Sequence, residues 1–222
     1  LKLPFMNKTA LTVEKLNKVY KNKLGNTKAL NDLSFDVNQG EIFGLLGPNG
    51  AGKTTFLSIL AGTVMKSSGQ INVWGFDIDQ NPRQVRASIG IVPQEVNIDA
   101  FFSPKKLLEL QAGLYGVKNK DRITDYILKM VSLDKQANSY SRTLSGGMKR
   151  RLLIAKAMVH QPPILILDEP TASMDNKSKI EVTKLVKKLG EKSTIILITH
   201  DDILLDYVDR KITFDKGKIV DK

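Results

Sequence analysis

The stretch GPNGAGKTT at residues 47–55 combines three glycines with one lysine and two threonines. It matches the pattern G-x-x-x-x-G-K-[ST], whose glycines let backbone N–H groups converge on phosphate oxygens. In this pattern the lysine meets the β and γ phosphates of a nucleotide, and the next hydroxyl offers an oxygen to Mg²⁺. A glycine-rich turn with a chance lysine is the plainer alternative, but the stretch lies between a predicted strand and a predicted helix. We therefore predict a phosphate site, with Thr54 as a Mg²⁺ ligand, formed by Gly47, Pro48, Asn49, Gly50, Ala51, Gly52, Lys53, Thr54 and Thr55.

Two adjacent carboxylates, Asp168 and Glu169, follow the apolar run ILIL. Two acids at the end of a buried strand are costly unless a metal or a polar network uses them. We predict that Asp168 holds Mg²⁺ through water and that Glu169 polarises an attacking water as general base. A solvated acidic turn is the alternative. The chain contains no Asn-Lys-x-Asp motif of the kind that reads guanine, which argues against a GTPase.

A second candidate anion site begins at Ser145 in LSGGMKRR. The Ser145 hydroxyl and the amides of Gly146 and Gly147 can bind a phosphate at the start of a helix. Ser145 could equally be an ordinary N-cap followed by flexible turn residues. One chain would then carry two phosphate-binding helix starts, an arrangement that makes sense if two copies share one site.

The elements that must position these groups follow from the apolar runs. Four short runs each end in a polar feature; these features are the phosphate loop, Gln94, Asp168 with Glu169, and His200. Continuous apolar runs that alternate with helical patterns predict a parallel sheet covered on both faces. Ligands of such sheets bind at the carboxyl edge of the strands. We therefore expect Gln94, as a ligand of Mg²⁺ or of the attacking water, and His200 to join the phosphate site.

The remaining segments differ from this pattern. Alternation around Leu11–Val13 and Leu33–Val37 predicts half-buried strands before the phosphate loop. Ser103 and Pro104 form a helix start, and leucines then recur at helical spacing until Gly116. A helical insert is therefore predicted between Gln94 and the second anion site.

The composition excludes several classes of protein. The chain has no cysteine, which rules out disulfides and thiolate metal sites, and its apolar runs are too short to cross a bilayer. Its formal net charge is +11, which could favour anionic lipid or nucleic acid. The lysines are scattered and lack aromatic interleaving, so we assign them to solvated faces and expect no nucleic acid partner.

These motifs, in this order, resemble those of the ATP-binding subunits of ABC transporters over nearly all of residues 9–220. GPNGAGKT is similar to the Walker A motif of that family, LSGGM to its signature and ILILDEP to its Walker B motif. Gln94 matches the family's Q-loop and His200 its switch histidine. The resemblance adds two residues that contact nucleotide: Asp175 matches the D-loop aspartate, and Tyr20 lies where the family stacks an aromatic ring on adenine. A strand tyrosine needs no ligand, so Tyr20 could also be structural.

The resemblance implies a single ABC ATPase domain over residues 1–222. Its fold class would be α/β, a P-loop NTPase core with a mostly parallel sheet, an N-terminal antiparallel β subdomain and a helical subdomain insert. The core and β subdomain would comprise residues 9–93 and 160–222, and the helical subdomain residues 95–159.

It also implies an ATPase that uses ATP and Mg²⁺ and acts as a homo- or heterodimer. Each ATP would lie between the Walker A motif of one copy and the signature of the other. The protein would be peripheral, on the cytoplasmic side of a bacterial-type cell membrane, and would energise export through a separate integral membrane subunit. The methionine in SGGMKRR resembles exporters of antibiotics, nodulation factors, polysaccharides or lipids. The rival function is a translation or DNA-repair factor, but the chain has one cassette, no heptad insert and no cysteine. A regulatory ATP binder without turnover is disfavoured by Glu169 and His200.

Overall fold

A six-stranded sheet forms the centre of the part that the computed structural model describes, residues 9–22 and 25–221. Its strands are β3 (Ile42–Leu46), β6 (Ile89–Val92), β7 (Ile164–Asp168), β8 (Thr194–Ile198), β9 (Arg210–Asp215) and β10 (Lys218–Asp221). The order is β10-β9-β3-β8-β7-β6, and all neighbours pair in parallel except β10 with β9. The predicted parallel sheet is therefore confirmed. The carboxyl ends of β3, β6, β7 and β8 meet at one edge.

Each buried strand supplies side chains to two cores, because successive residues of a strand point to opposite faces. In β7, Ile164 and Ile166 join one hydrophobic cluster, whereas Leu165 and Leu167 join the other. This explains why the run ILIL has no polar member. A strand with helices or a second sheet on both sides has no solvated face.

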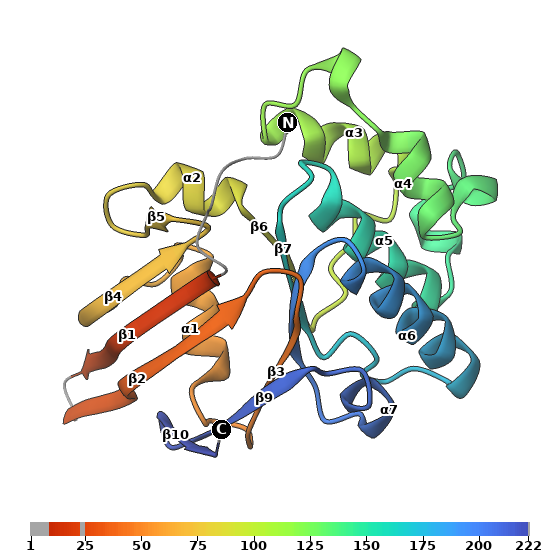
Figure 1. Cartoon of the computed structure of the whole chain (residues 1–222). Coiled ribbons are helices and arrows are strands. Elements are labelled where there is room, and N and C mark those ends of the chain that lie inside the picture. Colours follow the sequence, from red (N-terminus) through yellow and green to blue (C-terminus); the bar gives the residue numbers. More distant parts are fainter. Residues whose placement is uncertain (1–8, 23–24, 222) are drawn as a thin grey trace.

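A second, four-stranded antiparallel sheet covers one of these cores. It contains β1 (Thr9–Asn22), β2 (Gly25–Asn38), β4 (Ser68–Val73) and β5 (Phe76–Asp77) in the order β2-β1-β4-β5. Helix α1 (Lys53–Leu60) packs between the two sheets, where Phe35, Phe43, Phe56 and Phe214 make edge-on and stacked ring contacts. Figure 1 shows this sheet and α1 on one side of the molecule. The predicted antiparallel N-terminal strands are confirmed.

Helices cover the other face of the central sheet, as Figure 1 shows. They are α3 (Pro104–Leu114), α4 (Thr124–Met130), α5 (Gly146–Met158) and α6 (Asn176–Gly190), with short 3₁₀ turns at Asn119–Asp121, Asp134–Gln136 and Ser141–Thr143. Ser103 caps α3 by accepting a hydrogen bond from the Lys106 amide, as the Ser-Pro pair predicted. Leu110 and Leu114, two of the periodic leucines, are exposed, because α3 buries Leu107 and the neighbouring side chains instead.

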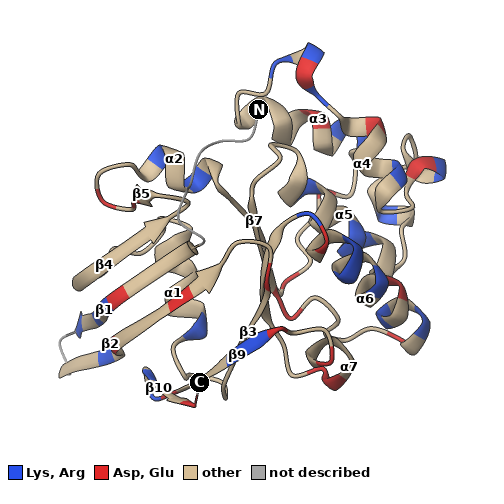
Figure 2. Cartoon of the chain, viewed as in Figure 1, with Lys and Arg blue, Asp and Glu red and all other residues tan. Residues whose placement is uncertain are grey.

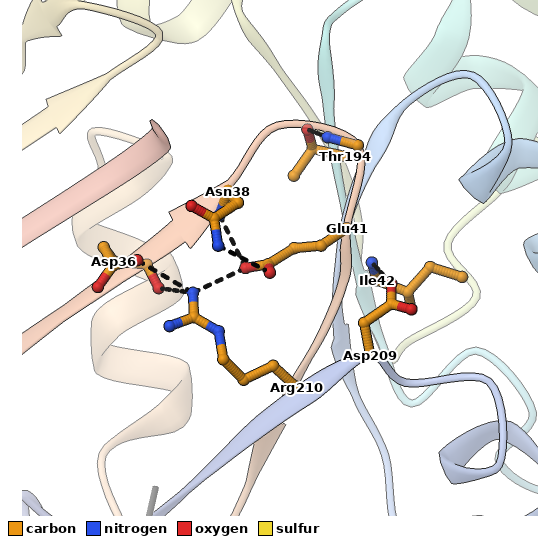
Figure 3. Close-up of polar contacts among 8 residues, drawn as sticks. Asp36, Asn38, Glu41, Ile42, Thr194, Asp209 and Arg210 are labelled. Carbon is orange, nitrogen blue, oxygen red and sulfur yellow. Dashed lines mark hydrogen bonds and ion pairs between the residues drawn. The ribbon is translucent and has the colours of Figure 1, made fainter. Parts of the chain in front are cut away.

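A polar network fixes the end of β2 against the central sheet (Figure 3). The Arg210 guanidinium donates to the Asp36 carboxylate at 3.1 Å and to the Glu41 carboxylate at 2.9 Å. Glu41 also accepts the Asn38 amide at 2.7 Å, and the Asp209 carboxylate accepts the Ile42 amide at 2.8 Å. This network places β3, and with it the phosphate loop, in register with β9.

Several elements had no clear signal in the sequence. They are α2 (Pro82–Ala87), α7 (Asp202–Leu205), β5 and the β9–β10 hairpin. The division near residues 95 and 159 stays a prediction, because α3–α5 share one hydrophobic cluster with α6 and the sheet. Figure 2 shows basic residues on both halves of the molecule. Over residues 9–22 and 25–221, every helix is too short or too polar to span a bilayer.

Candidate nucleotide-binding site

The loop between β3 and α1 adopts a backbone that only glycine allows at two points. Gly47 has φ 136°, and a Cβ there would lie 2.2 Å from the Phe214 carbonyl oxygen. Gly52 has φ 109°, and its Cβ would lie 2.8 Å from the Ala29 carbonyl oxygen. Side chains would therefore push the loop off the β9–β10 hairpin and β2. Gly52 is also the N-cap of α1, and no side chain caps this helix, so its first amides remain available to an anion.

Lys53 begins α1 and bends back over the loop. Its ammonium donates to the carbonyl oxygens of Gly47 and of Pro48, the latter at 3.0 Å. Burial lowers the pKa of Lys53, and the charges of Glu169 and Asp168 partly oppose this effect. A phosphate in the loop would supply the negative charge that this partly buried ammonium lacks.

Asp168 and Glu169 extend from the end of β7 toward the same loop. Glu169 has φ 46°, a left-handed conformation that is uncommon outside glycine. Its amide donates to the Ile198 carbonyl at 2.8 Å, which ties the turn to β8. The His200 Nε2 atom lies 3.5 Å from Glu169 Oε1, and the His200 amide lies 3.4 Å from Glu169 Oε2. The unusual backbone therefore turns the Glu169 carboxylate toward His200, two residues after the end of β8.

One cleft of about 350 Å³ contains most of the predicted site. It is lined by Ala29, Pro48, Asn49, Gly50, Ala51, Gly52, Lys53, Thr54, Thr55, Gln94, Asp168, Glu169, Ala172 and His200. Residues from four parallel strand ends therefore meet here, as the sheet topology requires. A cleft of this size with a glycine-rich loop, one cation and two carboxylates can bind a nucleoside triphosphate and supply a base.

The donor set also fits Mg²⁺ carried by a nucleotide. Burial raises the pKa of Asp168, and the neighbouring Glu169 charge adds to this, whereas Lys53 and Arg150 lower it. A divalent cation would relieve that cost, and the Thr54 hydroxyl and Gln94 line the same cleft. No three Asp, Glu or His side chains gather into a metal cage in the described ranges. Mg²⁺ is typically held by one or two carboxylates together with substrate phosphates, and Asp168 offers such a carboxylate in this cleft.

The other predicted contacts lie outside this cleft. Ser145 caps α5 by accepting the Met148 amide at 3.3 Å, and Gly146 lines a neighbouring cleft of about 430 Å³. A Cβ at Gly147 would lie 2.6 Å from the Ser178 hydroxyl of α6. Gly146 and Gly147 do not line the cleft that contains Lys53, and their nucleotide contacts stay predictions.

Asp175 and Tyr20 have local partners of their own. Asp175 is the N-cap of α6 and accepts the Ser178 amide at 3.0 Å. Hydrogen bonds from that backbone hold the pKa of Asp175 below its ordinary value. Tyr20 lies on β1 with the Lys18 ammonium 4.7 Å from its ring centre. Their proposed contacts with nucleotide likewise stay predictions.

The sequence did not point to Ala29, Ala172 or Arg150. Ala29 and Ala172 line the cleft because the backbone passes there, and a methyl side chain gives no chemical signal in the sequence. Arg150 is 3 % exposed and donates to the carbonyls of Pro93 and Gln94. It lies in the basic run KRR, which resembles a solvated helix face, so composition alone could not identify it as buried.

Comparisons with curated proteins agree with this geometry. The chain is 38 % identical over 203 residues to the Nod factor export ATP-binding protein I of Cupriavidus pinatubonensis, and the match covers 90 % of this chain and 61 % of that protein. It is 36 % identical over 215 residues to the linearmycin resistance ATP-binding protein LnrL of Bacillus subtilis, covering 95 % and 68 %. The chain therefore spans about two thirds of the length of these relatives.

Solved structures share the whole fold. The cassette MJ0796, solved as a dimer in a post-hydrolysis state with ADP and Pi, superposes with a TM-score of 0.81 at 26 % identity, covering 95 % of this chain and 96 % of that one. The cbiO1 protein of Clostridium perfringens, described as part of the ABC transporter complex cbiONQ, gives a TM-score of 0.83 at 32 % identity, covering 96 % and 88 %. The model of the ABC transporter family matches residues 30–172, a span that includes the phosphate loop, Gln94, the Ser145 turn and both acids. With these residues folded around one cleft, the chain belongs to the ABC transporter family of ATP-binding domains.

Proposed function

We propose that this chain hydrolyses ATP and that the reaction drives export through a separate membrane subunit. The observation that carries the proposal is the meeting of the Lys53 ammonium with Asp168, Glu169 and His200 in one cleft. The loop amides and Lys53 would bind the β and γ phosphates. Thr54, Gln94 and Asp168 would hold Mg²⁺, which neutralises phosphate charge when bound.

Glu169 is the proposed general base. Its carboxylate would accept a proton from the water that attacks the γ phosphorus, while the bond to the β-phosphate oxygen breaks and ADP and inorganic phosphate form. His200, 3.5 Å away, would orient that carboxylate and contact the γ phosphate. The side chain of Glu169 is 16 % exposed, so the base would work in a partly desolvated site where its charge is strongly felt.

The Glu169→Gln variant tests this role. It keeps the shape of the side chain and removes its basicity, so turnover should fall by roughly 10²–10⁴ while MgATP affinity is retained. Glu191→Gln, an exposed acid after α6, is the matched control and should hydrolyse ATP normally. Steady-state hydrolysis near the wild-type rate in Glu169→Gln would exclude Glu169 as the base.

Two copies are proposed to share each nucleotide. The Ser145 hydroxyl and the amides of Gly146 and Gly147 start a helix whose first turn carries no acidic side chain. A two-fold axis would bring this helix start of one copy to the γ phosphate held by Lys53 of the other, and would form two such sites at once. The dimeric MJ0796 cassette supports this arrangement.

The membrane subunit is proposed to dock on the segment that begins at Gln94. After this residue the chain passes through exposed Phe101, which is 72 % exposed, and reaches Leu110 and Leu114 on α3, of which Leu114 is 83 % exposed. Isolated apolar side chains on a surface are ordinary, but several along one segment favour a protein contact. Because the same segment starts in the nucleotide cleft, closure around ATP would move it.

Thiol crosslinking to the membrane subunit tests this surface, since the chain has no cysteine of its own. A Leu114→Cys variant should crosslink to the partner, whereas Val220→Cys on β10, 59 % exposed, should not. Crosslinks confined to position 220 would contradict the proposed docking surface. Crosslinking to ribosomes or DNA instead would favour the soluble-factor alternative.

The proposed direction is export, at the cytoplasmic face of a bacterial-type membrane. The names of the two curated relatives described above concern Nod factor export and linearmycin resistance. The methionine at position 148, which follows the two signature glycines, agrees with that branch. The class of cargo would be an antibiotic, a nodulation factor, a polysaccharide or a lipid.

A further inference from the structure

Arg150 joins the signature helix to the start of the Gln94 segment. It lies on α5, one turn beyond Ser145, and is almost fully buried. Its guanidinium donates to the Pro93 carbonyl at 2.8 Å and to the Gln94 carbonyl at 2.7 Å. Pro93 follows β6 directly, so the two bonds clamp the point where the chain leaves the central sheet.

The chemistry of this contact is specific to arginine. A planar guanidinium presents fixed donors that can reach two adjacent carbonyls together, whereas an ammonium is a point charge on a flexible stem. Burying a guanidinium is costly, and the Nε atom of Arg150 lies buried without a partner. Such a cost is unusual for a residue whose only task is to fill space, because an apolar side chain would pack as well.

We propose that Arg150 is the positioning residue that sets Gln94 for hydrolysis and makes the Gln94 segment move with the signature helix. The proposal rests on the function proposed above, because it needs Gln94 to act on Mg²⁺ or water. Displacement of α5 on contact with a second copy would pass through Arg150 to the backbone of Gln94. The negative charge of Asp168 offsets part of the cost of burying the Arg150 guanidinium, although burial still lowers the pKa of Arg150.

Arg151 provides a matched control on the same helix. It is also buried, but it donates to the Val131 carbonyl at 2.9 Å and pairs with Glu181 at 3.3 Å, away from Gln94. Arg150→Lys and Arg151→Lys therefore each keep the charge and remove one arginine clamp. Only the first should affect the nucleotide site.

Hydrogen exchange of the full chain gives a test that needs no turnover. In Arg150→Lys, the amides of β6 (Ile89–Val92) that pair with β7 should exchange about tenfold faster, the scale of one hydrogen bond to a charged group, while those of residues 131–133 stay unchanged. Arg151→Lys should show the reverse. Thermal unfolding confirms that each variant is folded, and Arg150→Gln replaces Arg150→Lys if the latter is not. Unchanged exchange of the β6 amides in a folded Arg150 variant would overturn the proposal.

A double-mutant cycle tests the link to Gln94. Arg150→Lys should lower kcat roughly 10- to 100-fold, the scale of a small misplacement of a reacting group, and leave MgATP affinity unchanged. In the Gln94→Ala background it should cause no further loss, because the residue that it positions is gone. Equal losses in both backgrounds would show a purely structural role and refute the proposal. If the wild-type chain does not hydrolyse MgATP, the proposed function fails, whereas the hydrogen-exchange contrast still decides whether the clamp exists.

Discussion

The two glycines that follow Ser145 have different surroundings. This difference allows the steric effect of an added aspartate side chain to be separated from the effect of its charge. A Cβ at Gly147 would lie 2.6 Å from the Ser178 hydroxyl and 2.8 Å from Ser178 Cβ, whereas a Cβ at Gly146 meets nothing within 4 Å. Aspartate at position 147 must therefore displace α6 of its own chain, at a cost of about 1–3 kcal/mol for overpacking. Aspartate at position 146 fits freely.

Gly146→Asp should therefore leave the single copy intact and still prevent dimerisation. A carboxylate in the first turn of α5 stabilises the helix by about 0.3–1 kcal/mol. Opposite a γ phosphate in the dimer, the same charge should cost several kcal/mol. A cost of about 3 kcal/mol weakens the dimer roughly 10²-fold.

The assay is light scattering in MgATP with Glu169→Gln as the background, because a protein that does not hydrolyse ATP should accumulate as the dimer. Gly146→Asn is the control, since it adds the same bulk without the charge and should still dimerise. Gly147→Asp should lower the melting temperature, by about 2–4 °C for each kcal/mol lost. An ATP-dependent dimer that survives Gly146→Asp would show that the signature does not face the nucleotide.

Three further predictions concern the cleft and the fold. Lys53→Ala should abolish MgATP binding in a titration, because it removes the charge that meets the β and γ phosphates. Asp168→Asn should raise the free energy of unfolding of the nucleotide-free protein by about 0.5–2 kcal/mol, because removing an unfavourable charge from a functional site often stabilises the fold. The same variant should weaken Mg²⁺-dependent ATP binding. A lower melting temperature of the nucleotide-free variant would contradict the stability prediction. Arg210→Ala should reduce stability by about 1 kcal/mol, since it removes hydrogen bonds to two carboxylates at a half-exposed site, and it should leave MgATP affinity unchanged.

Periodicity and motif spacing predicted the elements that carry the site. Buried parallel strands leave no polar residue within the run, so ILIL and IILI stand out. Asp168 and His200, which follow these runs within two residues, fall at the ligand edge. The phosphate loop needs glycine because its backbone has positive φ angles, which other residues rarely adopt. This requirement can be recognised from the local sequence pattern. These features are local in the chain.

The parts that could not be predicted depend on contacts between distant residues. Leucine spacing on α3 did not show that Leu110 and Leu114 face outward, because an interface with another protein and a core use the same side chains. Arg150 belongs to a basic run, and its burial follows only from the packing of α5 on β6. The steric limit at Gly147 comes from Ser178, which is 31 positions away in the chain.

Burial of charged groups in the nucleotide cleft destabilises the fold in the absence of a ligand. Burial and the Glu169 charge raise the pKa of Asp168 above its ordinary 3.8, so the folded protein binds a proton there more readily than the unfolded chain does. Stability from this group is therefore present at low pH and is lost as the pH rises through the folded pKa. Burial likewise lowers the pKa of Lys53, so its protonation opposes folding at neutral pH. MgATP would place a cation beside Asp168 and phosphates beside Lys53, and so reverse both penalties. MgATP binding should consequently raise the free energy of unfolding by mass action. The increase should be larger above the pKa of Asp168 than below it.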